Sequence, residues 1–286
     1  MQTLHEVSAP DNAATQPAVV FAHANGYPPE AYRTLFEPLL PHCRLMTVEH
    51  RPFWQRGPAL TTQNWRVYAD DLVETLKREA TEPVFLVGHS MGAVIGMLAA
   101  LQQPALFRGI VALDPVLIPF KMWLPGQILR AVGKELPMVQ SALRRPACFD
   151  SHEAAFAFYR KKRPFRRVSD EVLWDYVLGG HATRDGGVSL RWTGAWEACV
   201  YRSAPLMLSR LRGLRIATLG IVGRESDVCR PGNLEKWQRA MPSAEIHAVE
   251  GGHLLPLENP GACVKLITPF LTRESDHRES RRKSTI

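Results

Sequence analysis

The motif GHSMG at residues 88–92 carries the strongest chemical signal in the sequence. An apolar run predicts a strand directly before it, and small and apolar residues predict a helix directly after it. A serine on such a sharp strand-to-helix turn is held in a strained conformation with its hydroxyl exposed. Gly88 and Gly92 suit the turn because a Cβ at either position would clash. We therefore predict that Ser90 is a nucleophile, the alternative being a serine that only caps the helix.

A serine hydroxyl needs a base that removes its proton before it can attack. His253, within the segment 250–256, is the predicted base because two glycines before it let the loop bend back over the sheet edge. A surface histidine is the alternative. We interpret His89 as a packing or supporting group, and His23 as a residue that shapes its own loop through hydrogen bonds.

The base in turn needs a carboxylate that fixes its tautomer and stabilises the imidazolium. Asp227 and Asp114 both follow predicted strands. Asp227 comes after a glycine-led turn and precedes His253 in the chain, so we predict that Asp227 is the acid. There are two alternatives. One is Asp114, which lies at a strand end that could reach the same histidine, and the other is Glu225.

A tetrahedral intermediate needs hydrogen-bond donors for its oxyanion. The backbone N–H of Met91, directly after the nucleophile, is one predicted donor. The backbone N–H of Asn25 is the other, in the loop 23–28 that follows the first strong strand, where Gly26 permits a turn. The Asn25 side chain could instead cap the next helix or favour the bend.

Apolar runs and amphipathic stretches alternate along the chain, and they must position these residues. The predicted strands are residues 17–23, 45–49, 84–87, 110–113, 216–222 and 245–249. The predicted helices are residues 31–40, 64–80, 92–103 and 260–271. Strands that alternate with helices indicate an α/β fold with a mostly parallel sheet covered by helices on both faces.

Residues 117–205 break this alternation, because they contain several helical stretches, no clear strand and about half of the aromatic residues. We predict a helical cap inserted after the strand that ends near Asp114, over the carboxyl edge of the sheet, where such sheets bind ligands. The predicted division is a core of residues 1–116 and 206–271, a cap of residues 117–205 and a disordered tail of residues 272–286.

The composition excludes several classes of protein. A chain of 286 residues with 45% hydrophobic and 22% charged residues is typical of a globular protein and not of a disordered or fibrous one. Apolar runs fall short of the roughly 20 residues that span a bilayer, and we expect no secretory signal in residues 1–17. Five scattered cysteines favour a reducing cytoplasm over a zinc site or a disulfide framework.

The net charge of +7 is concentrated in residues 160–167 and in the tail. The rest of the chain is close to neutral, so we expect no nucleic-acid partner. We interpret the basic cluster 160–167 as a solvated helix end, the alternative being a site for an anionic ligand or a membrane surface.

The sequence resembles the α/β-hydrolase superfamily over residues 18–271. The order Ser90, Asp227, His253 matches the nucleophile, acid and base of that fold. The resemblance implies a helical cap, and within the superfamily the chain looks most similar to capped single-domain bacterial esterases and lipases.

The loops around the site both match and depart from the superfamily. Met91 and Asn25 match its oxyanion positions. Ala24 follows His23 where the superfamily usually has glycine, and the acid loop 223–227 is one residue longer than is common.

The resemblance and the serine together imply acyl transfer to water. A serine excludes relatives that use an aspartate nucleophile, such as haloalkane dehalogenases and epoxide hydrolases. We predict a carboxylesterase or lipase-like enzyme that cleaves small or lipid-like esters with apolar acyl groups. Thioesterase, lactonase, carbon–carbon hydrolase and perhydrolase activities are alternatives, and a catalytically inactive ligand-binding protein of this fold is an alternative from another class. The sequence implies no metal and no organic cofactor.

Overall fold

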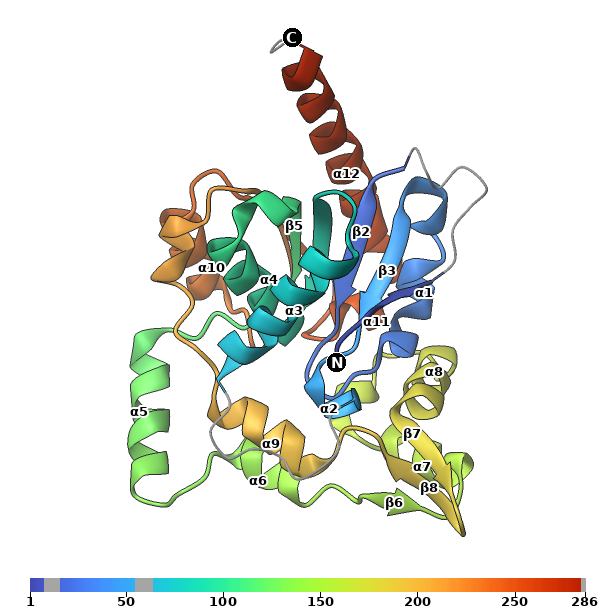
Figure 1. Cartoon of the computed structure of the whole chain (residues 1–286). Helices are drawn as coiled ribbons and strands as arrows, with labels where there is room; N and C mark the ends of the chain where they lie inside the picture. The colour runs from blue at the N-terminus through green and yellow to red at the C-terminus, as the bar shows by residue number, and fades with distance from the viewer. Residues whose placement is uncertain (8–15, 55–63, 284–286) are drawn as a thin grey trace.

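A seven-stranded sheet forms the centre of the computed structural model, which describes residues 1–7, 16–54 and 64–283 (Figure 1). The strand order is β1-β3-β2-β4-β5-β9-β10, and all neighbours are parallel except the edge pair β1 and β3. The strands are β1 (Leu4–Glu6), β2 (Ala18–Ala22), β3 (Arg44–Val48), β4 (Val84–His89), β5 (Phe107–Leu113), β9 (Ala217–Gly223) and β10 (Glu245–Val249). The predicted α/β class with a mostly parallel sheet is therefore confirmed.

The central strands are apolar because both faces of the sheet are covered. Every residue of β2 and β4 is buried, as expected for parallel strands between two helix layers. All six predicted strands are present, and their bounds differ from the predicted ones by a few residues. The three-residue edge strand β1 was not predicted.

One face of the sheet packs against α3 (Trp65–Glu79), α4 (Met91–Gln102) and α10 (Pro231–Ala240). The other packs against α1 (Arg33–Phe36), α11 (Leu255–Glu258) and α12 (Pro260–Lys283). In α3 the apolar stripe predicted from the period of the sequence is buried, and Asn64 caps the helix by accepting a hydrogen bond from the Arg66 N–H.

Two predicted elements differ from the structure. Residues 31–40 form a 3₁₀ turn, the single-turn helix α1 and the start of another 3₁₀ turn instead of one helix, because Pro38 and Pro41 lack the N–H that a continuous helix needs. The disordered tail is also wrong for residues 272–283, because α12 continues to Lys283 and projects beyond the body (Figure 1). Its last turns contain neither glycine nor proline and are rich in good helix formers.

An insertion between β5 and β9 lies below the sheet in the view of Figure 1. Its helices are α5 (Phe120–Ala131), α6 (Pro137–Leu143), α7 (His152–Arg160), α8 (Asp170–Gly180) and α9 (Gly194–Arg202). It also holds a small antiparallel sheet of β6 (Cys148–Phe149), β8 (Gly187–Leu190) and β7 (His181–Arg184).

The expectation that the insertion has no strand is wrong. β7 and β8 form a hairpin around Asp185-Gly186, where Gly186 has φ 74°. An Asp-Gly pair is a strong hairpin signal, but the flanking strands are short and partly polar and so give no apolar run. Within the described residues, no helix is both long and apolar enough to span a bilayer.

Candidate active site

Ser90 lies on the turn between β4 and α4, with φ 55° and ψ −111°. A Cβ on Gly92 would lie 2.0 Å from the carbonyl oxygen of Ala22, and a Cβ on Gly88 would lie 2.5 Å from the backbone nitrogen of Ala93. Both glycines are therefore required by close backbone approach. The turn has the geometry of a nucleophile elbow, which presents the serine side chain at the carboxyl end of the sheet.

His253 contacts this serine from the loop between β10 and α11. Its Nε2 lies 2.9 Å from the Ser90 Oγ. The loop bends at Gly251, which has φ 137°, and the Gly252 N–H donates to a carboxylate oxygen of Glu258 at 2.6 Å. The two glycines thus bring the imidazole back over the sheet edge to Ser90, for which His253 is the predicted base.

Asp114 completes a hydrogen-bonded chain with these two residues. Its Oδ2 accepts from the Nδ1–H of His253 at 2.6 Å and from the hydroxyl of Ser226 at 2.5 Å, while its Oδ1 accepts from the Gly223 N–H at 3.0 Å. The carboxyl group is fully buried, and the residue has φ 42°, a left-handed conformation that aspartate tolerates better than most residues. Three donors therefore surround one buried carboxylate and hold it in a fixed position.

The prediction that Asp227 is the partner of His253 is wrong. The Asp227 side chain is 64% exposed, and its carboxylate lies 4.0 Å from the Arg163 guanidinium. The loop after β9 turns Ser226 inward and Asp227 outward. Since β5 lies between β4 and β9 in the sheet, the residue that ends β5 is already next to the serine. Glu225 pairs with Arg167 and is also not the partner.

The predicted oxyanion donors lie at the expected elements. Met91 is the first residue of α4, where helical N–H groups have no partner in the helix. Asn25 follows β2, and Gly26 turns the loop with φ 76°. Within the described residues, the backbone N–H groups of Asn25 and Met91 donate no hydrogen bond. The Asn25 amide caps no helix and instead donates to the carbonyl oxygen of Glu197 in α9 at 3.2 Å.

A hydrogen-bonded chain through His89 links the Ala24 N–H to the backbone of His253. The Ala24 N–H donates to the Tyr32 hydroxyl at 3.2 Å, the hydroxyl lies 2.7 Å from His89 Nδ1, and His89 Nε2 lies 2.9 Å from the His253 carbonyl. A carbonyl can only accept, so Nε2 carries the proton and Nδ1 accepts from Tyr32. Burial, together with the nearby His253, lowers the pKa of His89 to about 3. His89 is therefore neutral and holds the His253 backbone in place.

His23 acts on its own loop, as expected. Its Nδ1–H donates to the Ala24 carbonyl at 2.8 Å, and its Nε2 accepts from the His50 N–H at 3.1 Å. Burial lowers the pKa of His23 well below its usual value, and burial lowers the pKa of His50 to about 3. The core therefore holds these histidines in their neutral form.

The neutral buried histidines make folding stability depend on pH. In the unfolded chain they bind protons below pH 6.5, whereas in the native state His89 and His50 do so only near pH 3. The free energy of unfolding should therefore fall as the pH drops below 6.5, by about 1.4 kcal/mol per pH unit for each histidine. Urea unfolding of His89→Gln should show a slope between pH 6 and 4 that is smaller by about one proton. An unchanged slope in His89→Gln would contradict the prediction.

Sequence reasoning missed two residues of the site, Tyr32 and Ser226. The signal for Ser226 was its position beside Asp227 in the loop after a strand. Tyr32 gave no signal, because nothing in a short loop segment indicates that its hydroxyl reaches His89.

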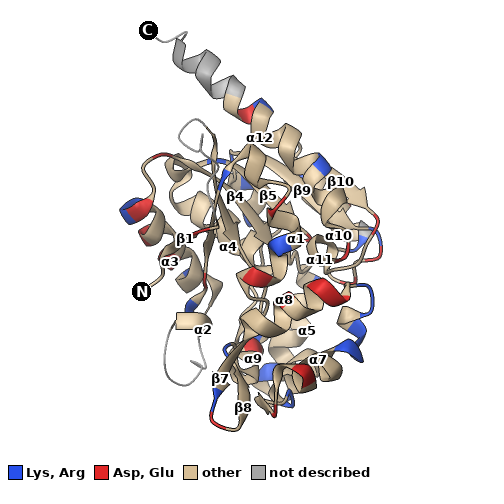
Figure 2. Cartoon of the chain, turned by 90° about the vertical axis from the view of Figure 1, so that its right-hand side faces the viewer, with Lys and Arg blue, Asp and Glu red and all other residues tan. Residues whose placement is uncertain are grey.

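Three of the six basic residues in the cluster 160–167 lie near carboxylates. Arg160 contacts Asp170 at 3.0 Å, Arg167 contacts Glu225, and Arg163 lies 4.0 Å from Asp227. In Figure 2 this loop lies at the right edge of the insertion, close to the acidic start of α8. The interpretation of the cluster as a solvated helix end stays a prediction.

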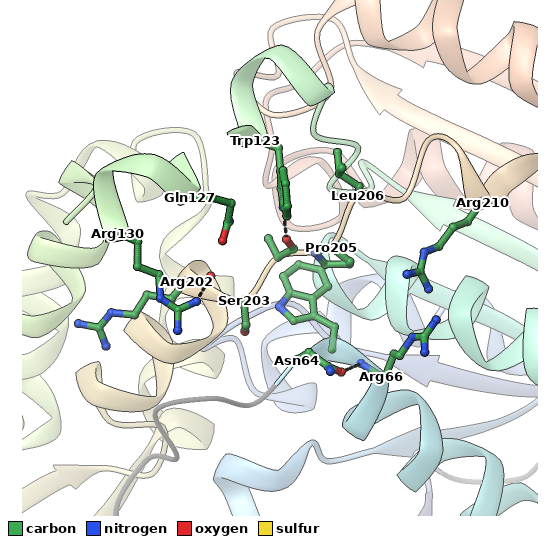
Figure 3. Close-up of a pocket in the computed structure, with 12 residues that line it drawn as sticks. Asn64, Arg66, Trp123, Gln127, Arg130, Arg202, Ser203, Pro205, Leu206 and Arg210 are labelled. Carbon is green, nitrogen blue, oxygen red and sulfur yellow. Dashed lines mark hydrogen bonds between the residues drawn. The ribbon is translucent and has the colours of Figure 1, made fainter. Parts of the chain in front are cut away.

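A separate cavity of about 440 Å³ lies between the insertion and the start of α3 (Figure 3). None of the predicted site residues lines it. Its lining includes two tryptophans and four arginines: Trp65, Trp123, Arg66, Arg130, Arg202 and Arg210. Of these arginines, Arg202 pairs with Glu135 at 2.7 Å. The cavity therefore has an excess of positive charge.

A parallel sheet with a serine elbow, a histidine loop and a buried aspartate defines the α/β-hydrolase class. The model of the family described as "Alpha/beta hydrolase family" matches residues 19–266. The chain therefore belongs to this family, and the resemblance seen in the sequence is confirmed.

The relatives of the chain include a lipase and other proteins of the same fold. The chain is 25% identical over 267 residues to an sn-1-specific diacylglycerol lipase of Mus musculus, which covers 91% of the chain and 83% of that protein. It is 25% identical over 233 residues to the peroxisomal membrane protein LPX1 of Saccharomyces cerevisiae, which covers 74% of the chain. The structure of an E-2-(acetamidomethylene)succinate hydrolase superposes with a TM-score of 0.75 at 23% identity, over 94% of both chains.

The matches differ in how much of each relative they span. The chain matches 60% of the length of the yeast protein and 22% of a monoglyceride lipase of Rattus norvegicus. The sequence relatives of the chain thus include lipases, and the structures of a thioesterase domain and an enol-lactonase share its fold at 19% and 17% identity.

Proposed function

We propose that this protein is a serine hydrolase that cleaves carboxylic esters with apolar acyl groups through an acyl-enzyme. The observation that carries the proposal is the unbroken chain of hydrogen bonds from Ser90 through His253 to Asp114. A serine, an oriented histidine and a buried carboxylate in this order have the geometry of a catalytic triad.

The proposed reaction has two halves. In the first, Ser90 Oγ attacks the ester carbonyl while its proton moves to His253 Nε2, and His253 then protonates the departing alcohol. In the second, water attacks the acyl-enzyme, His253 takes the proton from water and returns it to Ser90, and the carboxylic acid leaves. Asp114 holds the Nδ1–H of His253 and stabilises the imidazolium that forms in both halves.

The backbone N–H groups of Asn25 and Met91 are the proposed donors to the tetrahedral oxyanion. Their lack of other acceptors within the described residues supports this role. Met91 also begins α4, so the positive end of the helix dipole points at the developing negative charge.

The proposed specificity for apolar acyl groups rests on the insertion. Trp192 and Trp196 reach from it into the same buried cluster as Met91 and Leu117, at the carboxyl end of the sheet. We propose that residues 117–205 act as a cap over the core of residues 1–116 and 206–271, and that this cap supplies apolar walls for the acyl chain.

A fluorophosphonate probe tests the nucleophile, and p-nitrophenyl esters from acetate to palmitate test the substrate class. We expect the folded protein to be modified at Ser90, as located by peptide mapping, and the best chain length to report the depth of the acyl pocket. A folded protein whose Ser90 does not react would favour the inactive ligand-binding alternative and overturn the proposal.

The arginine-lined cavity favours a second candidate, hydrolysis of an acyl thioester with an anionic carrier such as coenzyme A. Arg66 and Arg210 there could attract phosphate groups. An acyl-coenzyme A and the matching N-acetylcysteamine thioester separate the candidates. This second candidate is supported if the protein prefers the acyl-coenzyme A and if Arg66→Ala weakens that preference. Lactones should be tested as substrates in the same experiment.

We propose the cytoplasm as the location, because scattered cysteines without paired spacing favour a reducing compartment. The proposed partner is a small or lipid-like ester, and no nucleic acid is expected.

A further inference from the structure

Exposed large apolar side chains are concentrated in one part of the insertion, residues 120–143. Those in this stretch are 37% to 64% exposed: Phe120, Met122, Leu124, Ile128, Leu129, Val132, Met138 and Leu143. Elsewhere among the described residues, the large apolar side chains exposed to this degree are Met1 and Leu178. A concentration of exposed apolar side chains in one short stretch is typical of a site of interaction with another molecule or with a membrane.

Helix α5 carries most of this surface and is attached to the body by one face. The Trp123 indole N–H donates to the Ala204 carbonyl at 3.0 Å, and Arg130 donates to the Arg202 carbonyl at 3.3 Å. No residue of α5 is buried, and Figure 1 shows the helix upright at the left edge of the insertion.

The outer face of α5 is left uncovered. At 100° per residue, Ile128 and Val132 point away from the face that carries Trp123 and Gln127. Gln127 and Trp123 line the cavity of Figure 3. The helix therefore turns its polar and anchored side to the body and an apolar side to the surroundings.

The charged residues of the same stretch are mostly basic. Lys121, Lys134 and Arg144 are exposed, and none of them forms an ion pair with another described residue. Arg130 is also exposed, but it lies on the anchored side of α5 and lines the cavity. The acid within this stretch, Glu135, is occupied by Arg202 at 2.7 Å. The surface thus combines apolar side chains with unneutralised cations.

We propose that residues 120–144 form a docking surface for an anionic lipid bilayer. Apolar side chains on an exposed helix enter the boundary between headgroups and acyl chains, while lysine and arginine contact the anionic headgroups. A symmetric contact between two copies of the chain fits less well, because it would place the same cations opposite one another.

Docking would bring the site to the lipid. The short segment 115–119 connects Asp114 to α5, so the start of the bound helix is close in the chain to the end of β5. Docking would give the active site access to lipid-like esters, and this consequence rests on the proposed function. The docking itself needs no catalysis.

Sedimentation with vesicles tests the docking. We expect the full chain to bind vesicles of phosphatidylglycerol and phosphatidylcholine, to bind pure phosphatidylcholine much less, and to be released as salt screens the charges. The triple variant Ile128→Ser, Leu129→Ser, Val132→Ser should lower binding to the anionic vesicles by about tenfold or more, because it removes three apolar side chains that would enter the bilayer.

Leu178→Ser is the matched control, because Leu178 is equally exposed but lies on α8 outside the surface. It should bind vesicles like the original chain. Thermal unfolding should show that all variants fold, and hydrolysis of water-soluble p-nitrophenyl acetate should be equal in all of them.

Three results would overturn the proposal: no preference for anionic vesicles, equal loss of binding in Leu178→Ser, or a dimer in solution that the triple variant dissociates. Failure of the proposed function is recognised separately, because it would abolish ester hydrolysis while vesicle binding remained.

Discussion

Replacing Ser90 with alanine should lower kcat/KM for p-nitrophenyl esters by about 10⁴-fold or more. The alanine has no hydroxyl to attack the carbonyl, and the 2.9 Å contact with His253 Nε2 is lost. The fold should persist, because the side chain only shrinks and the backbone of the elbow is held by Gly88 and Gly92. A residual rate from the oxyanion donors and from substrate binding is expected to remain.

The measurement is steady-state hydrolysis of the best ester, with fluorophosphonate labelling of the same samples. The exposed Ser209→Ala is the matched control and should be labelled and active like the original chain. Ser90→Ala with undiminished activity would mean that another residue attacks the substrate.

Replacing Asp114 with asparagine should lower kcat/KM by about 10⁴-fold, whereas Asp227→Asn should change it by less than about twofold. The amide introduced by Asp114→Asn can present its N–H to His253 Nδ1, which favours the tautomer that cannot accept the serine proton. Asp227 is mostly exposed, and the Arg163 guanidinium lies 4.0 Å from its carboxylate. Exposed ion pairs of this kind contribute little to the stability of the fold.

The two variants should be compared at several pH values, with urea unfolding to separate catalysis from stability. With its NH2 group facing His253, Asp114→Asn removes the buried acceptor of the Ser226 hydroxyl but keeps an oxygen for the Gly223 N–H, so some loss of stability accompanies the loss of activity. A large loss in Asp227→Asn with an active Asp114→Asn would reverse the assignment made from the structure.

The nucleophile elbow and the histidine loop could be predicted because each is contained in one short segment. The glycines in residues 88–92 and 251–252 indicate tight turns without any knowledge of the rest of the fold. The apolar runs beside them identify the strands. The structure brings Ser90 and His253 together as these segments suggest.

The acid could not be chosen in the same way, because the choice depends on which strands are neighbours. Asp114 and Asp227 both follow strands in the sequence, but β5 is adjacent to β4 whereas β9 is one strand further away. Strand order arises from packing of the whole sheet, and a local pattern does not contain it. The same holds for Tyr32, whose partner His89 is distant in the chain.

The elements that were missed are short or polar. Strands β6 to β8 have two to four residues each, which is too few for a period of two to be recognised. Conversely, the charged end of α12 looks like a disordered tail by composition, although its residues have good helix propensity.

The hydrogen bond from the Asn25 side chain to the Glu197 carbonyl joins the loop after β2 to helix α9 of the insertion. Arg145, also from the insertion, pairs with Glu197 at 3.1 Å and lies beside Gly26 of that loop. An outward displacement of α9 must therefore either break this bond or drag the loop with it. If a substrate enters by such a displacement, its entry would either break the Asn25–Glu197 hydrogen bond or shift the proposed oxyanion donor Asn25 together with α9.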